Sequence, residues 1–89
     1  MSESEDIIAV IENLKYIEHA YYDLQTLISK KEYNKDVDET TIENLKNRLK
    51  TYYAFIPYDI SVIKHNNTYS IVKQKLENYQ LKIPRLLSL

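Results

Sequence analysis

Residues 7–28, with the sequence IIAVIENLKYIEHAYYDLQTLI, decide the fold of this chain. Apolar side chains recur there at alternating steps of three and four residues: Ile7, Val10, Leu14, Ile17, Tyr21, Leu24 and Ile28. This spacing places all of them on one face of an α-helix. Ser2 and Glu5 form a capping-box pattern just before the stretch. We therefore predict a helix over about 4–31, roughly 40 Å long.

A second helix is predicted over about 41–56, where the apolar spacing resumes after a polar loop. Thr40 and Glu43 form its capping box. Pro57 is expected to end this helix, because the residue before a proline avoids the α region.

The last predicted helix covers about 69–82, with Thr68 as its cap. Pro84 is expected to end it and to leave a short apolar tail over 84–89. Two helices of this length span only about 20–25 Å each, so neither can cover the apolar face of the first helix alone. Either both helices line up along that face, or part of it is left for another chain. We expect a partner, for which a second copy of the chain is a candidate.

Residues 58–65 are predicted to form a short helix or turn. Tyr58, Ile60 and Val62 alternate with polar residues, however, and this alternation is also typical of a strand. A hairpin over 58–73, turning at Asn66-Asn67, is therefore the alternative. The expected fold is a single all-α domain over 1–89, a small bundle of three or four helices, with an α+β fold as the minority alternative.

The chain of 89 residues contains no glycine and no cysteine. Without glycine it lacks the phosphate-binding loops and the nucleophile elbow that need a backbone free of Cβ. Without cysteine it has no disulfide or thiolate–zinc site. No apolar run approaches the roughly 18 residues of a membrane span, and the acidic start is unlike a signal peptide. We expect a cytoplasmic protein that does not interact with a membrane.

Charge is divided unevenly along the chain. Residues 1–43 carry eleven acids and four bases, a balance of −7, and residues 44–89 carry two acids and eight bases, a balance of +6. Such an asymmetry indicates either charged partners or internal pairing. We expect the acidic first half to fold against the basic second half.

Catalytic and metal-binding patterns are not found. Neither His19 nor His65 has a second nitrogen or sulfur ligand one turn away, and His19 is explained by a surface pair with Asp23. Four carboxylates gather in the loop that follows residue 33, namely Asp36, Asp38, Glu39 and Glu43. A calcium loop would need a glycine for its sharp turn, so these acids suit a solvated helix start. No acid occupies a predicted core position. We expect a protein that is not an enzyme and takes no cofactor, metal or small-molecule substrate.

Nine tyrosines are unusual in a chain of this length. Tyrosine is favoured at protein interfaces, where its ring is buried and its hydroxyl stays wet. Tyr22, Tyr53 and Tyr58 are least explained by the predicted core stripes, so we expect them to contact a partner.

Basic residues of the second half could follow the phosphates of a nucleic acid. The candidates are Lys46, Arg48, Lys50, Lys73, Lys75, Lys82 and Arg85. Arg48 and its neighbouring lysines are followed by Tyr52 and Tyr53, which could stack on bases.

The C-terminal segment 80–87 contains a peptide-like pattern. Gln80, Ile83, Leu86 and Leu87 follow the spacing of a glutamine, an aliphatic residue and a terminal apolar pair. In this spacing and its terminal position the segment resembles sliding-clamp-binding peptides, although leucines stand where that class has aromatic residues. The resemblance implies docking to a replication clamp. The alternative is that the leucines of the tail fold back and cap the bundle.

The leading hypothesis is a non-catalytic interaction module, an accessory or regulatory subunit that docks on a larger protein or dimerises. A nucleic-acid-associated protein is the alternative, through direct contact or through a replication or transcription assembly. A small inhibitor or immunity-type protein is the third hypothesis.

Overall fold

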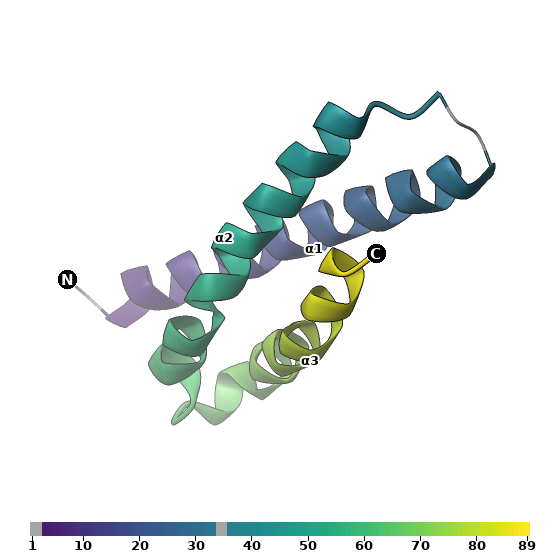
Figure 1. The fold of residues 1–89 in the computed structure, drawn as a ribbon. Helices are drawn as coiled ribbons and strands as arrows, with labels where there is room; N and C mark the ends of the chain where they lie inside the picture. The colour runs from purple at the N-terminus through teal and green to yellow at the C-terminus, as the bar shows by residue number, and fades with distance from the viewer. Residues whose placement is uncertain (1–2, 34–35) are drawn as a thin grey trace.

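The computed structural model describes residues 3–33 and 36–89, and the described residues form three α-helices and one short 3₁₀ helix. The helices are α1 (Glu3–Tyr33), α2 (Glu39–Ile63) and α3 (Ser70–Leu87), with η1 (Asn67–Tyr69) directly before α3 (Figure 1). No described residue lies in a strand. The all-α bundle is therefore confirmed, and the alternative hairpin over 58–73 is wrong. The molecule measures 47 × 22 × 16 Å, so its long dimension is about that of α1.

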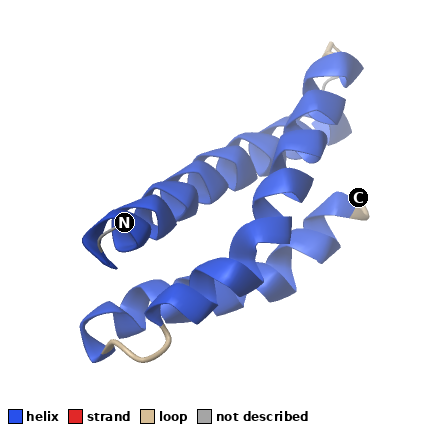
Figure 2. Cartoon of the chain, turned by 90° about the vertical axis from the view of Figure 1, so that its left-hand side faces the viewer, coloured by secondary structure: helices blue, strands red, loops and turns tan. Residues whose placement is uncertain are grey.

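The apolar stripe of α1 forms the centre of the core, as its spacing predicts. Its buried members are Ile7, Val10, Leu14, Ile17 and Leu24. Tyr21 and Ile28 are half-buried and pack against the same cluster. Both α2 and α3 pack against α1, and α3 also packs against α2 (Figure 2). One core therefore joins all three helices.

Pro57 lies inside α2, so the predicted helix end at residue 56 and the separate segment over 58–65 are wrong. A proline in a helix interior removes a backbone hydrogen bond and costs about 3 kcal/mol. Ile56 and Ile63 are buried on either side of it, and each such side chain contributes about 1.5–3 kcal/mol. Core packing thus outweighs the proline. Partway along its length α2 bends instead of ending (Figure 2).

Pro84 is accommodated in the same way inside α3. Ile83 is buried directly before it and Leu86 two residues after it, and the helix continues to Leu87. The predicted helix end at residue 82 is therefore wrong, as is the separate tail over 84–89. Only two residues follow the helix.

The longer helices change how α1 is covered. With 25 residues α2 is about 37 Å long, so it follows most of α1, and α3 adds a second layer. Ile7, Val10, Leu14, Ile17 and Leu24 of the stripe are buried within the chain. Of the two arrangements expected, the one in which both helices line up along α1 is found, and the one that leaves part of this face to another chain is wrong, because it rested on helix lengths that the prolines do not impose.

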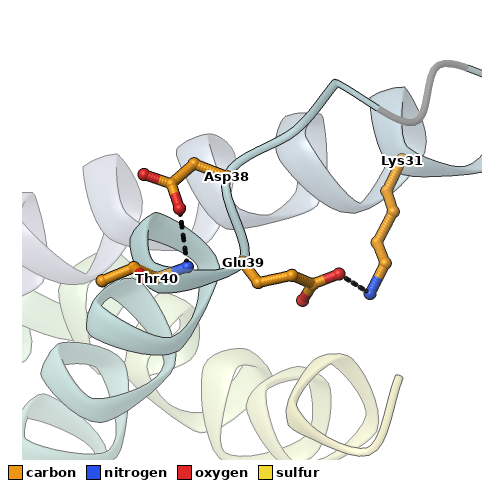
Figure 3. Close-up of polar contacts among 4 residues, drawn as sticks. All are labelled: Lys31, Asp38, Glu39 and Thr40. Atoms are coloured by element: carbon orange, nitrogen blue, oxygen red, sulfur yellow. Dashed lines mark hydrogen bonds and ion pairs between the residues drawn. The ribbon is translucent and has the colours of Figure 1, made fainter.

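Asp38, and not Thr40, caps the start of α2 (Figure 3). The Thr40 backbone N–H donates to Asp38 Oδ1 at 2.9 Å, and the Thr41 hydroxyl donates to Asp38 Oδ2 at 3.3 Å. The predicted capping box of Thr40 and Glu43 is therefore wrong. Lys31 Nζ lies 2.5 Å from Glu39 Oε1, which ties the end of α1 to the start of α2. The other predicted capping box includes Ser2, which lies outside the described residues.

The connection from α2 to α3 is made without any left-handed residue. Asn66 accepts a hydrogen bond from the Thr68 backbone N–H at 3.1 Å and caps η1, so the predicted cap at Thr68 is wrong. Lys64 ends α2 in the right-handed helical region, with φ −59° and ψ −25°. No described residue has a positive φ, in keeping with the absence of glycine.

Candidate functional site

A stacked pair of tyrosines on the α1–α2 hairpin is followed along α2 by two exposed aromatic side chains. Tyr16 of α1 stacks on Tyr52 of α2, with ring centroids 5.9 Å apart and an interplanar angle of 23°. Phe55 follows Tyr52 by three residues and Tyr58 follows Phe55 by three, so each is the surface neighbour of the one before. Tyr16, Phe55 and Tyr58 are 54%, 54% and 60% exposed. We call these four residues the aromatic ridge.

The three tyrosines predicted to contact a partner lie in different surroundings. Tyr58 belongs to the aromatic ridge, whereas Tyr22 is 67% exposed and lines a groove between α1 and α2. Tyr53 is half-buried and packs against the core, so its position is explained without contact to another protein. Tyr16 and Phe55 were not predicted from the sequence to contact a partner. Phe55 lies off the apolar stripe of α2, and this position could have indicated from the sequence that its ring is exposed.

The groove beside Tyr22 has a volume of about 460 Å³. Leu27 and Leu45 line it together with the oppositely charged Asp23 and Arg48. It therefore brings one predicted docking tyrosine next to Arg48, one of the predicted nucleic-acid contacts.

The basic residues do not form a single stripe. Lys46 and Lys50 are one turn apart on α2, but Arg48 lies between them and therefore projects from the other side of the helix. On α3, Lys75, Lys82 and Arg85 are exposed. Lys73 is half-buried on another side of that helix. The predicted stripe is thus divided among several surfaces.

The clamp-like segment is part of the core. Ile83 is fully buried and Leu86 is 5% exposed, while Gln80 and Leu87 are half-buried. All four belong to α3, so they are not presented as an extended peptide. Leu86 and Leu87 close the bundle, whereas Leu89 is 75% exposed.

Asp59 is a buried acid, 5% exposed, and the expectation that no acid occupies the core is wrong. Asn13 Nδ2 donates a hydrogen bond to Asp59 Oδ2 at 2.5 Å across the α1–α2 contact. Burial raises the pKa of the Asp59 carboxyl, and the hydrogen bond from Asn13 offsets part of that rise. Asp59 continues the three-and-four spacing of Ile56 and Ile63, and it was not recognised as a core position because the helix was predicted to end before Pro57.

A second aromatic contact ties α3 to α1. The rings of Tyr21 and Tyr79 meet edge to face with centroids 5.4 Å apart, and Lys82 Nζ lies 5.7 Å from the centroid of Tyr79. Burial raises the pKa of the Tyr79 hydroxyl, with smaller contributions from the Glu18 carboxylate and from Tyr21. This contact fixes the side of α3 from which Lys82 projects.

The remaining polar groups have structural partners or lie apart. In the acidic cluster Asp38 caps α2 and Glu39 pairs with Lys31. Both histidines are exposed, and His19 forms no ion pair with Asp23. Among the described residues no three potential ligands gather into a metal site.

The acidic first half of the chain folds against the basic second half, as expected, since α1 packs against α2 and α3. No described side chain of 5–33 forms an ion pair with a basic residue of 44–89. The ion pair between Lys31 and Glu39 joins two residues of the acidic half. The contact between α1 and the other helices is therefore made through the apolar core.

None of the described helices combines the length and the apolar character needed to cross a membrane. Comparisons with protein-family models, with curated proteins and with solved structures found no match.

Proposed function

We propose that this chain is a non-catalytic protein-interaction module, an accessory or regulatory subunit that docks on a larger protein through the aromatic ridge. The observation that supports this most is that Tyr16, Phe55 and Tyr58 are each more than half exposed on the α1–α2 hairpin, where Tyr16 stacks on Tyr52. Tyrosine and other large aromatic side chains are frequent anchors of protein interfaces.

Association with another protein needs more than one buried side chain, and the aromatic ridge offers several. Full burial of one large apolar side chain contributes about 1.5–3 kcal/mol, whereas association costs about 4–15 kcal/mol of translational and rotational freedom. A single exposed ring is therefore insufficient, and several rings in a row are required. The stacking of Tyr16 on Tyr52 also holds part of the ridge in place before binding, which lowers the cost of ordering it.

Substitution of the ridge tests this proposal. We expect Phe55→Ser with Tyr58→Ser to weaken partner binding by roughly tenfold or more, because two anchors are lost. Tyr33→Ser is the matched control, since Tyr33 is 91% exposed and lies outside the ridge. The measurement is quantitative mass spectrometry of proteins retained from the native source by the three tagged chains, with circular dichroism to verify folding.

A partner retained by the wild-type chain and by Tyr33→Ser, but not by the ridge variant, would support the proposal. Equal recovery by all three chains would contradict it. An inhibitor or immunity-type protein would use the same ridge, and the identity of the retained protein would distinguish that role from an accessory subunit.

Direct nucleic-acid binding is the second candidate, and the exposed lysine and arginine side chains of α3 favour it. Lys75, Lys82 and Arg85 could contact phosphates, in which case binding would fall steeply with salt. The other basic residues are divided among several surfaces of the molecule, which weakens this candidate. A labelled duplex and a labelled single strand that both fail to bind at low salt would eliminate it.

A further inference from the structure

The outer face of α3 combines exposed aliphatic and basic side chains. Ile71, Leu81 and Leu89 are 67%, 67% and 75% exposed. Lys75 and Lys82 lie seven residues apart on the same side of the helix as Ile71, which stands one turn before Lys75, and as the half-buried Tyr79 between them. We call the side of α3 that carries Ile71, Lys75 and Lys82 the basic face. None of the other described helices covers the exposed side chains of this face, whereas the core-facing residues of α3 are buried.

The N-terminal part of α1 carries the opposite pattern. Glu5 and Glu12 are exposed and also lie seven residues apart, and Ile8, which is 55% exposed, stands between them on the same side of the helix. We call these three residues the acidic face. Neither glutamate forms an ion pair with a base of the second half.

We propose that the basic face of α3 binds the acidic face of α1 in a second copy of this chain. Seven helical residues span about 10.5 Å, so Glu5 and Glu12 match the separation of Lys75 and Lys82 along a facing helix. Two ion pairs would then flank Ile8 of α1, with Ile71 of α3 one turn beyond the pair formed by Lys75. The inference rests on the proposed function only in taking docking as the mode of action, and it uses a surface other than the aromatic ridge.

Charge complementarity favours a protein over a nucleic acid as the occupant. A nucleic acid offers phosphates to the lysines, but the aromatic ring on the basic face, that of Tyr79, is half-buried between Tyr21 and Lys82 and is not free to stack on nucleobases. The chain has a net charge of −1, so it offers no general attraction to a polyanion.

Sedimentation velocity of the full chain over a range of concentrations tests the proposal. We expect self-association at low salt that weakens when the ionic strength is raised from about 0.05 M to about 0.5 M. Glu5→Lys with Glu12→Lys, and separately Lys75→Glu with Lys82→Glu, should each raise the dissociation constant roughly tenfold or more, because like charges then face each other.

Mixing the two charge-reversed variants provides the decisive measurement. Each variant carries the charge that the other now lacks, so we expect the equimolar mixture to associate although each variant alone does not. Lys30→Glu with Lys50→Glu is the control, since it changes the net charge equally at exposed positions outside both faces. Circular dichroism of each variant verifies the helix content.

A wild-type chain that stays monomeric at low salt would overturn the inference, and so would association unaffected by reversal of the faces. Duplex DNA bound by the wild-type chain and lost in Lys75→Glu with Lys82→Glu, without self-association, would assign the basic face to nucleic acid instead. None of these outcomes decides whether the aromatic ridge docks on a partner. That proposal is tested by partner recovery with Phe55→Ser and Tyr58→Ser, and not by sedimentation.

Discussion

Asn13 and Asp59 form a polar contact inside an otherwise apolar interface between α1 and α2. The carboxylate is taken out of water, and a single amide donor compensates for part of that loss. A shift of α2 along α1 by one turn would separate the pair and leave a buried carboxylate without a donor. The contact therefore favours one alignment of the two helices.

We predict that Asp59→Asn is more stable than the wild-type chain at pH 7, and that the difference shrinks as the pH falls toward about 4. The pKa of Asp59 is raised in the folded state. Its contribution to stability is thus complete below the unfolded pKa and is lost as the pH rises through the folded pKa. Urea unfolding at both pH values measures this. Asp23→Asn, at an exposed position, is the control, and an unchanged difference between the two pH values would contradict the mechanism.

Removal of the donor has the opposite effect. We expect Asn13→Ala to lower the free energy of unfolding by about 1–3 kcal/mol at pH 7, because a buried carboxylate loses its hydrogen bond. Asn47→Ala, at an exposed position, should change it by less than about 0.5 kcal/mol. If the two variants unfold at the same urea concentration, the contact between Asn13 and Asp59 does not stabilise the fold.

Local sequence signals account for only part of the extent of the three helices. The stripe of α1 was predictable, because its spacing is local and unbroken. The ends of α2 and α3 were not, because Ile63 and Leu86 are buried beyond the prolines, and that burial depends on the neighbouring helices. The same reason applies to the aromatic ridge. Tyr58 stood out in the sequence, but the stack of Tyr16 on Tyr52 depends on how α1 and α2 align.

The start of α2 supplies a test at the level of the element. We expect Asp38→Ala to cost about 1 kcal/mol of stability, since it removes the side chain that caps the helix. Thr40→Ala should cost less than about 0.5 kcal/mol, because only the backbone of Thr40 takes part in the cap. Thermal or urea unfolding of the two variants measures the difference. A larger loss of stability in Thr40→Ala than in Asp38→Ala would show that Thr40, as predicted from the sequence, caps the helix.

The whole molecule has one apolar core to which all three helices contribute. A domain of this size buries a limited apolar area, so loss of one core side chain removes a large share of its stability. The bundle is therefore expected to unfold as a unit.

We predict that Leu76→Ala, at a fully buried position of α3, lowers the free energy of unfolding by about 2–5 kcal/mol. Gln74→Ala, two residues away on the exposed side, should change it by less than about 0.5 kcal/mol. Circular dichroism and tyrosine fluorescence should follow one coincident transition. Separate transitions would show that α3 unfolds independently of the α1–α2 hairpin.

The absence of positive φ angles among the described residues has a consequence for mutational studies. In most proteins an alanine scan mixes two effects, because some positions need a conformation that a Cβ atom opposes. Here every described backbone position already tolerates a Cβ, so replacement by alanine removes a side chain without straining the main chain. Apart from the two prolines, the measured losses would form a direct map of side-chain contacts along this bundle.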